Sequence, residues 1–81
     1  MAVEQMKELV TFLARALVDA PEKVDVQVYD NEKRLTVELF VEEDDLGKII
    51  GRDGRTARAL RTLVASTAAK YRRRALLQIV E

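Results

Sequence analysis

The chain has 81 residues, with 14 basic and 14 acidic side chains and neither histidine nor cysteine. A chain of this length forms one domain with a modest core, so we expect residues 1–81 to be a single domain. The missing histidine and cysteine remove the commonest general base, nucleophile and zinc ligands. We therefore expect no enzyme, no metal site, no cofactor and no disulfide.

The charges are distributed unevenly along the chain. Residues 1–45 hold five Lys or Arg and twelve Asp or Glu, whereas residues 46–81 hold nine and two. This asymmetry indicates a basic working face beside an acidic remainder, although it is also typical of a helix with a solvated basic side. The N-terminus lacks a basic region followed by a long apolar run. We expect no signal peptide, no membrane span and a cytoplasmic location.

The first half of the chain predicts one helix and a strand hairpin. Residues 4–18 have the apolar period of an amphipathic helix, which Pro21 ends. Residues 24–29 and 35–41 alternate with a period of two, as half-buried strands do. The predicted buried stripe of the helix is Met6, Leu9, Val10, Leu13, Ala16 and Leu17. A tight turn centred on Asn31 and Glu32 pairs Val28 with Leu35, Val26 with Val37 and Val24 with Leu39, all on one face.

The second half predicts two helices and a strand. A short helix ends near Ile50 after an acidic run, in which Asp44 or Asp45 is expected to cap it. A long helix over residues 55–73 and a strand over residues 75–80 follow. The order is α-β-β-α-α-β, and the fold class is α+β. The long helix is expected to bury Ala57, Leu60, Val64, Thr67, Ala68 and Tyr71.

Two glycines, Gly51 and Gly54, interrupt the pattern between these helices. A helix that restarts after such a break presents unpaired N–H groups and a positive dipole end, which suit a phosphate. We expect this loop to be exposed, so that Gly51→Asp leaves the domain folded. The break predicts a module that grips a nucleic-acid backbone, and the cations around it are Lys48, Arg52, Arg55, Arg58 and Arg61.

The segment Ile49-Ile50-Gly51-Arg52-Asp53-Gly54-Arg55-Thr56 resembles the I-I-G-x-x-G-x-x signature of KH domains. With the order of elements, the chain is similar to type II KH domains and to the small bacterial KhpA-type family of RNA-binding proteins. The resemblance implies a three-stranded mixed sheet covered on one face by three helices. It also implies an RNA chaperone or regulator whose GxxG loop, residues 51–54, clamps single-stranded RNA. The RNA-binding candidates are Lys48, Ile49, Ile50, Gly51, Arg52, Asp53, Gly54, Arg55, Arg58 and Arg61.

Several candidate residues have two possible roles. One of Ile49 and Ile50 is expected to pack in the core, and the other to line a groove for bases. Asp53 is expected to cap the following helix or to orient a neighbouring arginine, rather than to bind phosphate. The run of residues 72–74, three arginines, either extends the basic face or ends the helix. Tyr29 and Phe40, on the sheet face away from the core, either stack bases or contact a partner.

The main alternative function is protein interaction. The long helix carries a second apolar flank, where an exposed leucine suggests a contact site, although an alanine-rich helix also arises from propensity alone. On this hypothesis the chain forms a homodimer, or a heterodimer with a larger KH-containing RNA-binding partner as the resemblance implies. The expected contact residues are Ala59, Leu63 and Ser66.

Overall fold

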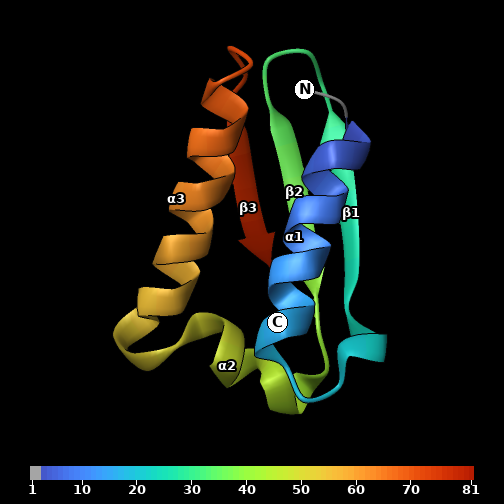
Figure 1. Cartoon of the computed structure of the whole chain (residues 1–81), viewed down its shortest axis with the longest axis vertical. Coiled ribbons are helices and arrows are strands. Elements are labelled where there is room, and N and C mark those ends of the chain that lie inside the picture. The colour runs from blue at the N-terminus through green and yellow to red at the C-terminus, as the bar shows by residue number, and fades with distance from the viewer. Residues whose placement is uncertain (1–2) are drawn as a thin grey trace.

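The computed structural model describes residues 3–81 and has the predicted order of major elements (Figure 1). Met1 and Ala2 of the expected domain lie outside the described residues. Three single-turn 3-10 helices join or extend the larger elements. The elements are α1 (Val3–Leu17), η1 (Pro21–Lys23), β1 (Asp25–Asp30), β2 (Leu35–Phe40), η2 (Glu43–Asp45), α2 (Leu46–Ile50), η3 (Arg52–Gly54), α3 (Arg55–Ala69) and β3 (Ala75–Ile79).

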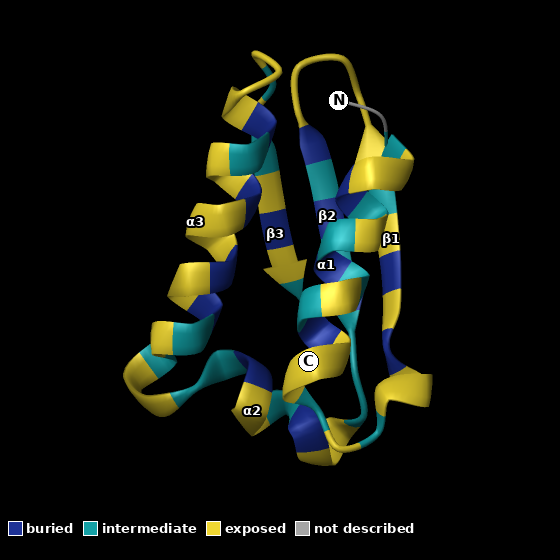
Figure 2. Ribbon diagram, viewed as in Figure 1, coloured by how far each residue is buried: buried dark blue, intermediate teal, exposed yellow. Residues whose placement is uncertain are grey.

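The three strands form a mixed sheet with β2 in the centre, as the KH resemblance implied. β2 runs antiparallel to β1 and parallel to β3. Figure 1 shows α1 and α3 over one face of the sheet, and α2 at the end away from the β1–β2 turn. The buried positions of α1 and α3 face the sheet, and their outer sides are exposed (Figure 2). One core therefore lies between the helices and one face of the sheet.

Helix α1 packs through a line of residues spaced four apart. Met6, Val10 and Ala14 are buried, as this spacing on one side of a helix predicts. The predicted stripe was wrong at Ala16 and Leu17, which are exposed, because Ala14 is the last residue of the helix in this buried line. The four other residues of the predicted stripe lie in or against the core.

The hairpin has the predicted inward face but a different register. Val28 faces Val37 rather than Leu35, and Val26 faces Leu39, so the pairing is shifted by two residues. Side chains alternate with a period of two, and a shift of two therefore leaves every residue on its predicted face. The apolar pattern predicts the face correctly and does not determine the register.

The β1–β2 turn explains the shift. It is centred on Glu32 and Lys33, one residue later than predicted. The main-chain N–H of Asn31 donates to the carbonyl of Arg34 (3.2 Å), and the N–H of Arg34 donates to Asn31 Oδ1 (2.9 Å). Glu32 has a left-handed φ of 73°. The Asn31 side chain thus closes the turn, which is a common role for asparagine.

Helix α3 ends at Ala69, four residues earlier than predicted. Arg72 adopts a left-handed φ of 60°, and the N–H groups of Arg72 and Arg73 donate to the carbonyls of Ala69 and Ala68 (both 3.0 Å). This is the pattern of a Schellman helix end. Tyr71 was predicted to be buried and is 50% exposed, because the helix has already ended there.

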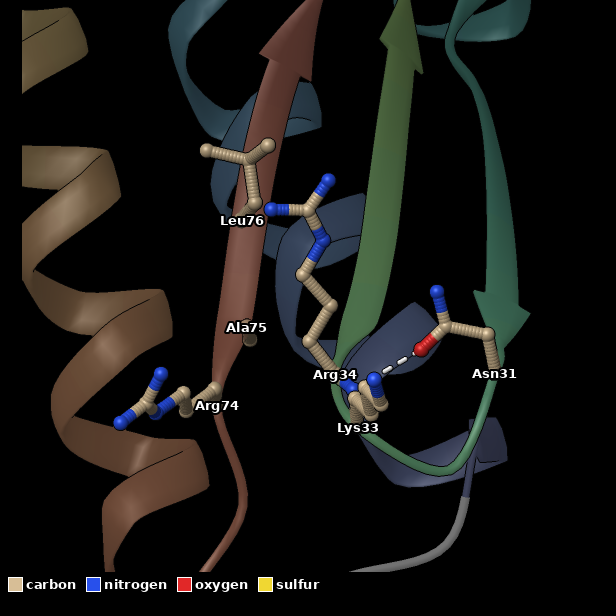
Figure 3. Close-up of a pocket in the computed structure, with 6 residues that line it drawn as sticks. All are labelled: Asn31, Lys33, Arg34, Arg74, Ala75 and Leu76. Carbon is tan, nitrogen blue, oxygen red and sulfur yellow. Dashed lines mark hydrogen bonds between the residues drawn. The ribbon is translucent and has the colours of Figure 1, made fainter.

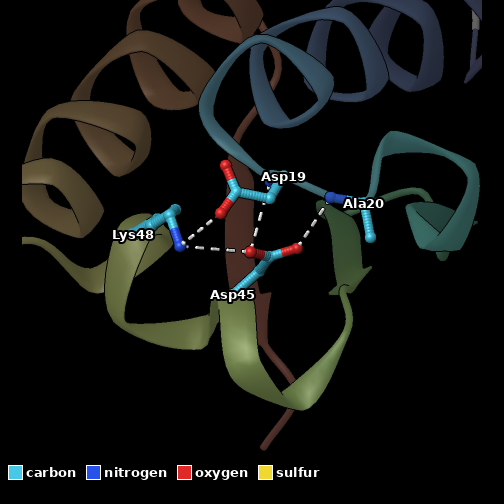
Figure 4. Close-up of polar contacts among 4 residues, drawn as sticks. All are labelled: Asp19, Ala20, Asp45 and Lys48. Atoms are coloured by element: carbon cyan, nitrogen blue, oxygen red, sulfur yellow. Dashed lines mark hydrogen bonds and ion pairs between the residues drawn. The ribbon is translucent and has the colours of Figure 1, made fainter.

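A buried carboxylate connects α2 to the chain between α1 and β1 (Figure 4). Asp45 was expected to cap α2, but no side-chain cap is formed there. The residue is only 3% exposed, and its carboxylate accepts hydrogen bonds from the N–H groups of Asp19 (3.2 Å) and Ala20 (3.0 Å). Lys48 Nζ lies 3.0 Å from Asp19 Oδ2 and 3.4 Å from Asp45 Oδ1. These contacts position α2 and the glycines that follow it.

The ionised form of Asp45 is favoured despite its burial. Burial raises the pKa of this carboxyl, but hydrogen bonds from the N–H groups of Ala20 and Asp19, together with Lys48, lower the pKa by more. The net pKa lies below the ordinary value. A lowered pKa stabilises the folded state at neutral pH, and this stabilisation is lost as the pH falls through the folded-state pKa.

We expect Asp45→Asn to lower the melting temperature by about 10 °C at neutral pH, because an amide supplies one acceptor oxygen in place of two. Asp44→Asn is the control, since Asp44 is exposed one residue away. The difference between wild type and Asp45→Asn should shrink as the pH falls below the ordinary carboxyl pKa of about 4, because the wild-type carboxyl, whose pKa is lowered, is then protonated. Thermal melts by circular dichroism measure both effects. Equal melting temperatures at neutral pH would contradict the role of Asp45.

Candidate nucleic-acid interface

The glycine loop, residues 51–54, turns the chain sharply between α2 and α3. Gly51 ends α2 with φ 75° and ψ 175°, and its N–H donates to the carbonyl of Gly47 (2.9 Å). Asp53 and Gly54 follow with left-handed φ values of 57° and 74°. Glycine adopts such conformations freely, and aspartate does so more readily than most residues. The loop therefore needs residues of these types.

Gly51 is required by both its backbone and its surroundings. A φ near 75° with ψ near 180° is accessible essentially only to glycine. A Cβ at this position would lie 2.1 Å from Thr56 Oγ1 and 2.9 Å from the main-chain nitrogen of Thr56. The premise that a side chain fits at Gly51 is therefore wrong, because Thr56 occupies that space, and Gly51→Asp is expected to destabilise the domain.

Gly54, in contrast, faces open space and precedes the first residue of α3. Apart from its chain neighbours, no described residue has an atom within 4 Å of a Cβ built at Gly54, and no described side chain caps the helix. The prediction that Asp53 caps α3 was wrong, because Gly54 occupies the cap position and Asp53 lies one residue earlier. The first turn of α3 has no acidic residue. Its first N–H groups and positive dipole end are thus open to an anion.

The arginines around the loop are exposed and form no ion pair with any described residue. Within residues 3–81, none of Arg52, Arg55, Arg58 and Arg61 forms an ion pair, and Asp53 pairs with none of them. An arginine in the first turn of a helix is unfavourable for the helix dipole, so Arg55 does not stabilise α3 there. One of these four arginines lies in the loop, and the other three lie in the first two turns of α3.

Lys48 differs from these arginines because its ammonium group is engaged. Hydrogen bonds and charge from Asp19 and Asp45 raise the pKa of Lys48. Its side chain is 44% exposed and forms the contacts shown in Figure 4. Lys48 thus helps to hold α2 against the end of α1, which the sequence did not indicate.

A hollow of about 320 Å³ opens beside the glycine loop, between α2, α3 and the end of β3. The two isoleucines separate as expected: Ile49 is fully buried in the core, and Ile50 lines the hollow. The wall is partly apolar and partly polar, and the polar part comes from two arginines and Glu81. The lining residues are Ile50, Gly54, Ala57, Arg58, Arg61, Ile79 and Glu81, and we call this site the loop hollow.

The geometry joins a glycine loop, a helix start and a three-stranded mixed sheet in the arrangement of a KH domain. A model of the family described as "KhpA/KhpB, KH domain" matches residues 7–79. This chain belongs to that family. The family consists of KH-domain binding proteins rather than enzymes.

Similar proteins span nearly the whole chain. An "RNA-binding protein KhpA" of Halalkalibacterium halodurans is 49% identical over 94% of this chain and 100% of its own length. Proteins of the same name from Borreliella burgdorferi and Aquifex aeolicus are 47% and 42% identical over 91% and 94% of this chain, and over 90% and 96% of their own lengths. No solved structure matched the chain.

The predicted interaction flank of this KH domain lies on the outer side of α3. Ala59, Leu63 and Ser66 are all exposed, and Leu63 is 47% exposed. A shallow hollow there is lined by Arg55, Arg58, Ala59, Thr62 and Leu63. Arg58 therefore borders both this hollow and the loop hollow. Whether the flank forms an interface stays a prediction.

The described residues include neither a metal-binding group nor a helix able to span a membrane. Residues 3–81 contain no group of three or more acidic, histidine or cysteine side chains placed to hold a metal ion. None of the helices in that range has the length and apolar character needed to cross a membrane.

Sequence reasoning missed Thr56, Ile79 and Glu81. The packing of Thr56 against Gly51 depends on the loop geometry, for which the sequence gives no signal. Ile79 was detectable, because the alternation of the last strand places it on the covered face, but only after that strand is positioned beside α3.

We expect Gly51→Ala to lower the free energy of unfolding by about 3 kcal/mol, because the backbone conformation and the clash with Thr56 both cost energy. Gly54→Ala should cost only about 1 kcal/mol, for its left-handed φ alone. Gly47→Ala is the control: it lies in α2 with open space around its Cβ and should be neutral or stabilising by about 0.5 kcal/mol. Urea denaturation measures all three. Similar losses at Gly51 and Gly54 would contradict the distinction.

Proposed function

We propose that this chain acts as a single type II KH domain that binds single-stranded RNA in the cytoplasm, as an RNA chaperone or post-transcriptional regulator. One observation carries the proposal: four arginines that form no ion pair within residues 3–81 lie just before, at and after an uncapped helix start beside the open Gly54. The relatives named RNA-binding proteins, similar over nearly their full lengths, support it.

In the proposed complex the RNA backbone follows the loop and the first turn of α3. The open side of Gly54 lets a phosphate approach the main chain, where the first N–H groups of α3 donate to it. Arg52 and Arg55 add charge on either side of that point. Gly51 and Asp53 contribute by shaping the loop, and Lys48 contributes by holding α2.

The bases occupy the loop hollow. Ile50, Ala57 and Ile79 supply apolar wall, against which a flat base can pack. Arg58 and Arg61 stand at the same hollow, where each can pair with a phosphate or stack on a base. Ile49 supports Ile50 from the core and touches no RNA.

The test measures the affinity for RNA after two positive charges have been removed from the loop hollow. We expect Arg58→Gln/Arg61→Gln to weaken binding of an oligonucleotide of about six nucleotides by at least about tenfold at low salt. The slope of log affinity against log salt should also become shallower by about 1.4, at about 0.7 for each lost phosphate contact. Fluorescence anisotropy measures both quantities.

A matched control removes two exposed cations elsewhere, Arg15→Gln/Lys23→Gln, and gives the same net charge. It should retain affinity within about twofold. Equal losses in both double variants would mean that overall charge, not the loop hollow, governs binding. Undiminished affinity in Arg58→Gln/Arg61→Gln would reject the proposal.

A second candidate function is dimerisation through α3, favoured by the exposed Leu63 and the shallow hollow around it. The partner is a second copy or a larger KH-containing RNA-binding protein, and the matched family model covers both KhpA and KhpB. Such an interface would use Ala59, Leu63 and Ser66 and leave Gly54 free for RNA.

We expect Leu63→Asp to convert the dimer into a folded monomer in sedimentation velocity, because a charge in an apolar interface stays unpaired. Phe12→Asp is the matched control, since Phe12 is 70% exposed on α1 and lies outside the proposed interface. A wild-type chain that remains monomeric at high concentration, alone and with a larger KH-containing protein, would exclude this function.

A further inference from the structure

A second basic hollow lies beside the β1–β2 turn, at the end of the molecule away from α2 (Figures 1 and 3). Its volume is about 550 Å³. It contains three cations and no carboxylate, and the proposed RNA site does not include it. The lining residues are Asn31, Lys33, Arg34, Arg74, Ala75 and Leu76, and we call this site the turn hollow.

Two arginines are fixed next to each other at this hollow by the sheet itself. The N–H of Leu35 donates to the carbonyl of Arg74 (2.8 Å), and Leu35 faces Ala75 in the parallel pairing of β2 and β3. Arg34 and Arg74 therefore start side by side, one residue before that pair. Their side chains then diverge, with Arg34 running toward Leu76 and Arg74 pointing away from Arg34 (Figure 3). Both arginines line the hollow that opens between the ends of the two strands.

No carboxylate within residues 3–81 neutralises these two arginines. Asp30, at the end of β1, is already paired with Arg73, whose Nη2 lies 2.6 Å from its Oδ1. Glu32, the other acid of the turn, does not line the hollow. The positive charge of Arg34 and Arg74 is thus left for a ligand.

The uncovered face of the sheet continues this site with side chains suited to bases. Tyr29 faces Thr36 across β1 and β2, and Thr36 faces Leu76 across β2 and β3. Tyr29 is 55% exposed and Leu76 is 36% exposed. Figure 3 shows the Arg34 side chain extending along the sheet toward Leu76. Exposed aromatic side chains on a sheet commonly stack on unpaired bases.

We propose that the turn hollow is a second contact for the same single-stranded RNA, with a phosphate between Arg34 and Arg74 and a base against Leu76 and Tyr29. The inference rests on the proposed function and extends it. Edge strand β3 contributes to both sites on opposite faces of the sheet, since Ile79 lines the loop hollow on the covered face and Leu76 lines the turn hollow on the uncovered face. Its five residues span roughly 15 Å, at about 3.3 Å per residue. An RNA longer than the loop hollow holds has to pass around the edge of β3 to contact both.

The test compares Arg34→Gln/Arg74→Gln with the control Arg15→Gln/Lys23→Gln on RNAs of about six and about sixteen nucleotides. Both arginines are exposed, so thermal melts should show a folded protein. On the long RNA, we expect Arg34→Gln/Arg74→Gln to lose about five- to tenfold in affinity and about 1.4 in salt slope. On the short RNA, both double variants should bind within about twofold of wild type.

Equal affinities of Arg34→Gln/Arg74→Gln and the control for the long RNA would overturn the inference. So would loss of poly-glutamate binding in Arg34→Gln/Arg74→Gln with unchanged RNA binding, because the hollow would then take an acidic polypeptide. Failure of the wild-type protein to bind either RNA would overturn the proposed function instead. Binding of the short RNA that depends on Arg58 and Arg61, together with no effect of Arg34→Gln/Arg74→Gln on binding of the long RNA, would overturn this inference alone.

Discussion

The close packing of Thr56 on the main chain of Gly51 is the constraint on which the rest of this interface depends. A Cβ at Gly51 would overlap Thr56, so only glycine lets α3 start this close to the end of α2. With α3 placed there, Gly54 is open to solvent and the first N–H groups of α3 point outward. The two glycines of the loop thus act differently: Gly51 determines the shape, and Gly54 leaves room for a ligand.

The basic residues of this domain likewise have two different roles, one in stabilising the fold and one, as proposed, in binding a ligand. Lys48 and Arg73 are neutralised by aspartates and connect segments that are distant in sequence, with Lys48 holding α2 near α1 and Arg73 joining the start of β3 to the end of β1. The arginines of the loop and of α3 have no such partners within residues 3–81. An ionic contact between exposed groups contributes little to stability, so leaving these arginines unpaired costs the fold little. The free charge is available for phosphates, and binding through it should depend on salt.

The sequence predicted the parts of the fold that depend on local pattern. Alternation along the strands and the glycine break gave the correct order of elements, and the covered face of the hairpin was right although its register was shifted by two residues. A period of two does not distinguish such registers, whereas the side chain of Asn31 does. The role of Asp45 was not predictable, because its partners at Asp19 and Ala20 lie more than 20 residues away. Asp53 was wrongly predicted to cap α3, because the helix begins at Arg55 and the cap position directly before it is held by Gly54.

The central claim is that RNA binds where α3 begins beside the open Gly54. Two-dimensional nuclear magnetic resonance of the ¹⁵N-labelled protein, titrated with a single-stranded RNA of about six nucleotides, tests it most directly. The account predicts that the largest amide shifts occur at Gly54, Arg55 and Thr56, with smaller shifts along α3 as far as Arg61, and that α1 is unaffected. Shifts concentrated on the outer side of α1, or a saturated complex in which the amides of residues 51–58 do not move, would contradict it.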